Sequence, residues 1–104
     1  MINLSRPNIS EQAIEAVAEV LRSGHLVHGS ENEAFEQELA AYLECREAIL
    51  VSSGTAALHV ALMALDISPG DAVLIPDFTF PATANAVMAV GARPVLVDVS
   101  EETY

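Results

Sequence analysis

Residues 49–59 read Ile49-Leu50-Val51-Ser52-Ser53-Gly54-Thr55-Ala56-Ala57-Leu58-His59, a short apolar run, four small residues and then an alanine- and leucine-rich run. This pattern predicts a buried strand, a tight turn and the start of a helix. The first N–H groups of a helix have no partner inside it, and the helix dipole adds positive charge there. Because small side chains let an anion approach, the sequence predicts a phosphate-binding turn at Ser52–Thr55. The alternative is a helix start capped by a hydroxyl, without a ligand.

Apolar runs alternate with helical patterns on the C-terminal side of this turn. Helices are expected over Thr55–Leu65 and Ala82–Val90, and strands over Ala48–Val51, Ala72–Ile75 and Pro94–Val97. Short strands that alternate with helices are typical of a parallel sheet covered on both faces. The fold class is therefore α/β, with a βαβαβ arrangement over residues 48–104 and a mostly parallel sheet.

Two helices and a loop are expected before this arrangement. Ser10 caps a first helix that runs to about Ser23, where Gly24 ends it, and a second helix runs from about Asn32 to Leu43. Residues 1–47 hold these helices and the loop between them. Three parallel strands make a poor independent unit, so we expect residues 1–104 to be part of one incomplete domain.

The helix expected over Thr55–Leu65 is apolar on nearly all sides. A helix with no polar face belongs in the interior of a domain, so we expect it to be buried. If the 104 residues fold alone, the same helix leaves exposed apolar surface and favours self-association.

Charge and composition exclude several classes of partner. The 104 residues are 52% hydrophobic, with a net charge of −11 from fifteen acidic residues, four arginines and no lysine. Nucleic acids and anionic membrane surfaces need clustered positive charge, so neither is an expected partner. No signal peptide is recognised and no apolar run is long enough for a membrane span, so we expect a soluble cytoplasmic protein. The single cysteine, Cys45, excludes an intrachain disulfide, and its neighbour Glu44 disfavours a reactive thiolate.

A second motif, Asp77-Phe78-Thr79-Phe80-Pro81, follows the second expected strand. It holds two of the five aromatic residues of the chain. In parallel sheets, ligands bind at the carboxyl ends of the strands, where both this loop and the Ser52–Thr55 turn are expected. An aromatic ring beside a phosphate site suits a flat ring that carries a phosphate. The alternative is that Phe78 and Phe80 cover the edge of the sheet.

These segments, in this order, resemble the N-terminal part of the DegT/DnrJ/EryC1/StrS aminotransferases. The resemblance covers essentially all 104 residues and rests on Ser23–Gly29, Val51–His59, Gly70–Phe80 and Gly91–Val99. It implies the large domain of a fold type I enzyme that depends on pyridoxal 5′-phosphate (PLP). Most members aminate keto sugars bound to a nucleotide. The resemblance therefore implies a sugar nucleotide substrate, glutamate as amino donor, a homodimer, and a role in making cell-surface polysaccharide or antibiotic sugars.

The resemblance also implies roles for individual residues. Gly54, Thr55 and Ala56 match the turn that binds the phosphate of PLP, and Phe80 matches the aromatic residue that stacks on its pyridine ring. The loop of residues 24–29 matches a segment near the substrate entrance. His28 is its candidate substrate-binding residue, against the alternative of a solvated loop histidine.

The chain departs from the family in having no lysine. A PLP aminotransferase needs a Schiff-base lysine, which also moves a proton, and an acid at the pyridine nitrogen. In the family both lie beyond the length of this chain, and Asp98 matches a different position. No catalytic residue and no metal site is therefore predicted, His59 is expected to be a core residue, and the 104 residues alone should be inactive.

Two other functions stay open at this point. One is a PLP-dependent sugar dehydratase of the same family, in which a histidine replaces the lysine. The other is a non-catalytic α/β module that binds a phosphorylated small molecule or pairs with another subunit.

Overall fold

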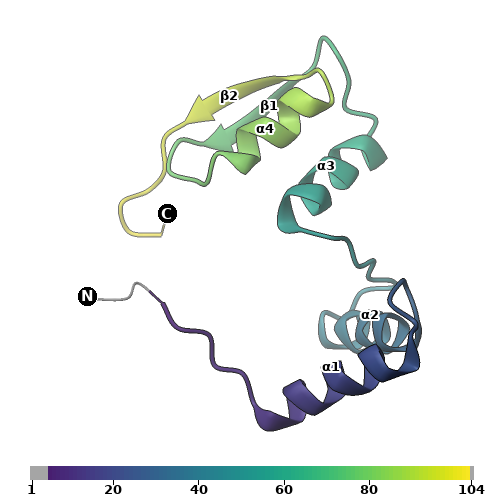
Figure 1. Ribbon diagram of the computed structural model, residues 1–104. Coiled ribbons are helices and arrows are strands. Elements are labelled where there is room, and N and C mark those ends of the chain that lie inside the picture. The colour runs from purple at the N-terminus through teal and green to yellow at the C-terminus, as the bar shows by residue number, and fades with distance from the viewer. Residues whose placement is uncertain (1–4, 104) are drawn as a thin grey trace. The chain divides into compact units, whose positions relative to one another are not determined.

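The computed structural model describes residues 5–103, and the chain divides into two compact units, Met1–Ile49 and Leu50–Tyr104. The first unit is helical, and the second unit contains both helices and strands (Figure 1). Within the described residues, no helix combines the length and the apolarity that crossing a membrane requires. The elements are α1 (Glu11–Ser23), α2 (Ser30–Tyr42), α3 (Gly54–Ala64), β1 (Ala72–Pro76), α4 (Ala82–Ala89) and β2 (Arg93–Val97).

The helix α1 begins and ends at the residues that the sequence predicts. Ser10 is extended, and its Oγ accepts a hydrogen bond from the N–H of Ala13 at 3.2 Å. Gly24 adopts a left-handed conformation with a φ of 72°, and its N–H donates to the carbonyl of Leu21 at 3.3 Å. Both predicted ends of this helix are confirmed.

The helix α2 begins two residues earlier than the prediction near Asn32. Gly29 is its N-cap, and the Gly29 N–H donates to Oδ1 of Asn32 at 3.4 Å. The cap is therefore supplied by a side chain inside the first turn rather than by the residue before it.

The second unit is built around two parallel strands. β1 pairs with β2 in a register that runs from Ala72 opposite Arg93 to Pro76 opposite Val97. α4 connects the two strands and packs on both, and α3 packs against α4. Ile75, Val87 and Ala92 form the buried core. The predicted α/β class, with parallel strands joined by a helix, is confirmed.

The strand expected over Ala48–Val51 is not formed. The sheet of the described residues contains β1 and β2, and residues 48–51 lie outside it. An extended apolar segment becomes part of a sheet only when a neighbouring strand pairs with its backbone N–H and carbonyl groups. The apolar pattern does not reveal whether such a neighbour is present, and the prediction of a third strand is wrong for this segment.

The helix α3 is apolar as expected, but none of its residues is buried. Met63 is 58% exposed, because α3 packs against α4 along one side only. One face of the sheet is also open, since Leu74 and Val97 are exposed on the face opposite the buried Ile75. The expectations of a buried helix and of a sheet covered on both faces are therefore wrong, and the exposed apolar surface expected of the chain folded alone is observed.

The helix α4 ends in a turn that only glycine fits well. Gly91 has a φ of 79°, in the left-handed region that other residues rarely adopt. The next N–H, from Ala92, donates back to the carbonyl of Val87 at 3.2 Å, and the two buried side chains close the turn. An ideal Cβ on Gly91 would lie 2.8 Å from Cγ of Pro69, so the neighbouring turn leaves no room for a side chain.

Candidate functional site

The predicted phosphate-binding turn forms the start of α3. Ser53 is the N-cap, and its Oγ accepts a hydrogen bond from the N–H of Ala56 at 3.1 Å. Gly54 and Thr55 are the first two residues of the helix, so neither N–H has an acceptor one turn earlier within it. These two N–H groups are the ones that the turn offers to an anion, whereas the N–H of Ala56 is already shared with Ser53.

Open space surrounds Gly54. A Cβ built on this residue would meet no atom within 4 Å, and its φ lies outside the left-handed region. Neither crowding nor backbone strain within the described residues therefore requires a glycine at this position. Close approach of a ligand to the start of the helix would account for it, since glycine lets another group come near the backbone.

Variants of Ser53 separate the cap from the anion site. Ser53→Ala should lower the free energy of unfolding by about 1 kcal/mol, because the cap to Ala56 is lost. Ser53→Asp should restore the cap while adding a negative charge beside the Gly54 N–H, and so weaken the binding of inorganic phosphate. Urea denaturation followed by circular dichroism measures the first effect, and the phosphate-dependent shift of the Gly54 amide in NMR spectra measures the second.

A second N-cap serine provides the matched control for these variants. Ser10 caps α1 as Ser53 caps α3, so Ser10→Asp adds the same charge at a helix where no anion site is predicted. We expect it to leave the Gly54 shift unchanged. Equal phosphate binding by wild type and Ser53→Asp would contradict an anion site at this turn.

Phe80 lies in the loop between β1 and α4. Asp77 continues the ladder one residue beyond β1, with its N–H 2.9 Å from the carbonyl of Val97, and Pro81 is the N-cap of α4. The loop therefore leaves the carboxyl end of β1, as predicted. Phe80 is 78% exposed and Phe78 is 74% exposed. The alternative in which both rings cover the edge of the sheet is not what the structure shows.

The structure places the predicted turn and the aromatic residue at one end of the second unit. α3 and α4 pack together and run in the same direction, so their first turns face the same way (Figure 1). This is the edge of an α/β sheet at which ligands bind. The first turn of α3 and the loop that precedes α4 therefore lie toward the same end of the second unit.

His28 lies in the first unit, in the loop between α1 and α2. Its Nε2 is 4.0 Å from Oε2 of Glu36, and a protonated imidazole would form an ion pair there. His28 therefore has a partner on α2. It belongs to the first unit, whereas Gly54 and Phe80 belong to the second.

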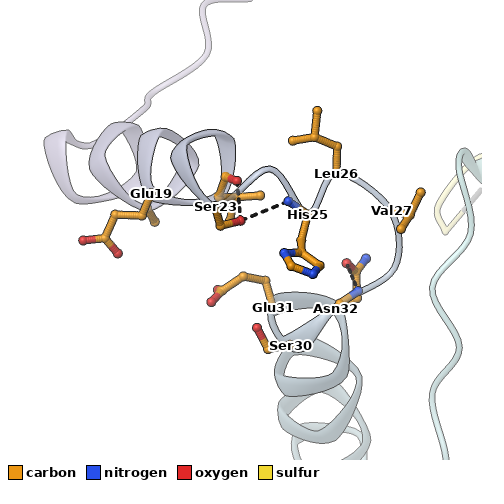
Figure 2. A pocket seen from close by; sticks show the side chains of 11 residues that line it. Glu19, Ser23, His25, Leu26, Val27, Ser30, Glu31 and Asn32 are labelled. Carbon is orange, nitrogen blue, oxygen red and sulfur yellow. Dashed lines mark hydrogen bonds between the residues drawn. The ribbon is translucent and has the colours of Figure 1, made fainter.

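A cavity of about 380 Å³ opens beside the same loop. It is lined by the end of α1, the loop and the first turn of α2, and Figure 2 shows the imidazole of His25 pointing toward α2. The loop leaves α1 in a fixed way, because the N–H of His25 donates to Oγ of Ser23 at 3.2 Å. His25 lines this cavity and His28 does not.

Comparison with known families tests the resemblance directly. Residues 7–104 match the model of the DegT/DnrJ/EryC1/StrS aminotransferase family, which is nearly the whole chain. The chain belongs to this family.

Several solved structures resemble this member of the DegT/DnrJ/EryC1/StrS aminotransferase family. One is a Streptococcus pneumoniae protein named as a sugar aminotransferase, solved in PLP, PMP and apo forms. It is 36% identical to this chain with a TM-score of 0.91, and the match covers 98% of this chain and 26% of the S. pneumoniae chain. An aminotransferase from Psychrobacter cryohalolentis is 40% identical, with a TM-score of 0.87 over 93% of this chain and 25% of its own. A Brucella abortus DegT DnrJ EryC1 StrS aminotransferase is 43% identical, with a TM-score of 0.82 over 88% and 24%. The chain thus spans about a quarter of the length of these relatives.

Two features of this DegT/DnrJ/EryC1/StrS chain escape sequence analysis. The hydroxyls of Thr79 and Thr83 lie 3.0 Å apart, across the start of α4. Their spacing of four residues is the only signal in the sequence, and the bond itself is exposed to solvent. The cavity next to His25 leaves no local pattern at all, because it depends on where the loop returns to α2.

Proposed function

We propose that this chain is the cofactor-binding segment of a PLP-dependent aminotransferase that transfers an amino group to a keto sugar carried on a nucleotide. The observation that carries the proposal is the shared end of the second unit, where α3 begins with two unpaired helix N–H groups and Phe80 exposes its ring. The S. pneumoniae relative, named as a sugar aminotransferase, supports the sugar substrate, and its PLP and PMP forms support the cofactor.

The residues present fit the phosphate and the ring of PLP. The N–H groups of Gly54 and Thr55 lie at the positive end of α3, which favours a phosphate. The open space beside Gly54 lets phosphate oxygens reach the backbone. The exposed ring of Phe80 is available to stack on a pyridine ring, and the N–H of Ala56 fixes the turn by donating to Oγ of Ser53. In this proposal the four residues bind and orient the cofactor, which when bound supplies an electron sink for amino transfer.

The chemical step depends on residues that these 104 do not contain. The sequence has no lysine, so we propose that covalent attachment of the cofactor and proton transfer are carried out elsewhere in the enzyme and that this chain alone is inactive. Glutamate as amino donor, a cytoplasmic location and a homodimer complete the proposal. His28 is proposed to contact the substrate from its loop.

The experiment replaces the matching segment of the S. pneumoniae relative with residues 7–103 of this chain. We expect the chimera to retain PLP, measured as cofactor released on denaturation, and to transfer an amino group from glutamate to a nucleotide-linked keto sugar. The chain alone should bind pyridoxamine 5′-phosphate, which has no aldehyde to react with amines, without transferring its amino group. The unmodified relative is the control.

The outcomes separate this function from a second candidate. The absence of lysine favours a non-catalytic module that binds a phosphorylated small molecule. A chimera that holds PLP but transfers no amino group would favour this module. A chimera with the circular dichroism spectrum of the relative but without PLP would contradict the cofactor-binding role of this segment.

A further inference from the structure

Two threonine side chains tie the aromatic loop to α4. Oγ1 of Thr79 and Oγ1 of Thr83 lie 3.0 Å apart, at hydrogen-bond distance with either atom as donor. Thr79 directly precedes Phe80, and Thr83 is the second residue of α4. The hydroxyl pair therefore connects the neighbour of Phe80 to a regular helix.

Thr83 makes two hydrogen bonds to the loop, one to the Phe80 carbonyl and one to the side chain of the preceding residue, Thr79. The N–H of Thr83 donates to the carbonyl of Phe80 at 3.1 Å, and its hydroxyl reaches Thr79. The helix that carries Thr83 is itself anchored, because Ala86 and Val87 are 2% exposed and pack in the core of the second unit. The position of Thr83 is thus set by the core and not by the loop.

The Phe80 ring has little packing to hold it. It is 78% exposed, so its place depends on the backbone that carries it. A loop that is already ordered binds a ligand more tightly than a mobile one, because less conformational entropy is lost on binding. A threonine has few χ1 rotamers, so a hydrogen bond to Thr83 restrains the Thr79 backbone as well as its side chain.

We propose that Thr83 is a positioning residue that, through Thr79, holds Phe80 ready to stack on the ring of the cofactor. This inference rests on the proposed function, since it concerns the same aromatic site. Thr83 does not touch the ring in this arrangement, and its hydroxyl acts only through the loop. Thr79 is the matching half of the pair, and removing either hydroxyl should have the same effect.

The test removes one hydroxyl at a time from the full chain. Thr83→Val keeps the shape of the side chain and the N–H bond to Phe80, and Thr79→Val breaks the same pair from the loop side without altering α4. We expect each to weaken pyridoxamine 5′-phosphate binding by about 3- to 10-fold in isothermal titration calorimetry. The double variant should be no weaker than either single one, because only one bond is lost. NMR relaxation without ligand should show residues 77–81 becoming more mobile in all three.

A conservative substitution and a remote one provide the controls. Thr83→Ser keeps the hydroxyl and should bind within about 2-fold of wild type. Thr103→Val removes a hydroxyl from an exposed turn and should change neither the affinity nor the mobility of the loop. The same variants in the chimera should lower its PLP content in the same order.

The outcomes distinguish a failure of the positioning role of Thr83 from a failure of the proposed cofactor-binding function. Wild type and Thr83→Val with equal affinity would overturn the positioning role while leaving the proposed function intact. Thr83→Ser as weak as Thr83→Val would also overturn it, because the hydroxyl would not be the cause. No binding by the wild-type chain and no PLP in its chimera would overturn the proposed function, and this inference with it. If Thr83→Val does not fold, Thr79→Val decides the question.

Discussion

Gly91→Ala should lower the free energy of unfolding of the second unit by about 2–4 kcal/mol. Two costs combine in this estimate. Alanine is strained at a φ of 79°, and its methyl group would lie 2.8 Å from Cγ of Pro69, where the ring must shift. Because the turn also brings Ala92 onto Val87, the loss should spread into the core. Urea denaturation, followed by circular dichroism, measures the change.

The chain contains a matched position that carries the strain without the contact. Gly24 has a φ of 72° after α1, and a Cβ there would meet no atom within 4 Å. Gly24→Ala should therefore cost only the left-handed conformation, about 1–2 kcal/mol. Pro69→Ala in the Gly91→Ala background should recover part of the loss by removing the crowding atoms. If Gly91→Ala costs no more than Gly24→Ala, the contact with Pro69 does not matter to stability.

Phe80→Ala should weaken pyridoxamine 5′-phosphate binding by about 10-fold or more, since stacking on an aromatic side chain contributes about 1–3 kcal/mol per ring. Phe80→Trp should preserve the affinity, because a larger aromatic face replaces the lost one. Isothermal titration calorimetry on the full chain measures both, with inorganic phosphate as a second ligand. Phosphate should bind all three proteins alike, because it has no ring to stack.

Phe78 is the control for this prediction. It lies in the same loop two residues earlier and is exposed to nearly the same extent, 74% against 78% for Phe80. Phe78→Ala should leave the affinity for pyridoxamine 5′-phosphate close to that of wild type. If Phe78→Ala and Phe80→Ala weaken the binding of pyridoxamine 5′-phosphate equally, its pyridine ring does not stack on Phe80 in particular. The assignment of Phe80 as the stacking residue would then fail.

Features of the fold that depend on neighbouring residues in the chain were predictable from the sequence. Ser10 and Gly24 set both ends of α1 through hydrogen bonds within three residues, so a local pattern suffices to find them. The apolar runs at β1 and β2 are strands because α4 brings them together. The run at residues 48–51 looks the same in the sequence but has no strand beside it, and only the tertiary arrangement distinguishes the two cases.

The candidate site divides in the same way. The places of Gly54 and Thr55 at the start of a helix and of Phe80 after a strand were predictable, because these patterns are visible in the sequence. Their contact with a cofactor stays a prediction. A hydroxyl cap was also among the possibilities that the sequence left open, and the structure shows that Ser53 supplies it by accepting from the N–H of Ala56. The Thr79–Thr83 pair was not predictable, because it depends on the path of the loop, which residue types do not specify.

The exposure of α3 also bears on how the molecule behaves in solution. Its apolar side chains, Leu58 and Met63 among them, form a surface on which other molecules could adhere. A net charge of −11 keeps copies of the chain apart through long-range repulsion. This repulsion reaches about 10 Å at 0.1 M salt but only about 3 Å at 1 M. The colloidal stability of the chain therefore rests on its surplus of carboxylates, and concentrated salt removes the barrier that keeps these apolar surfaces from meeting.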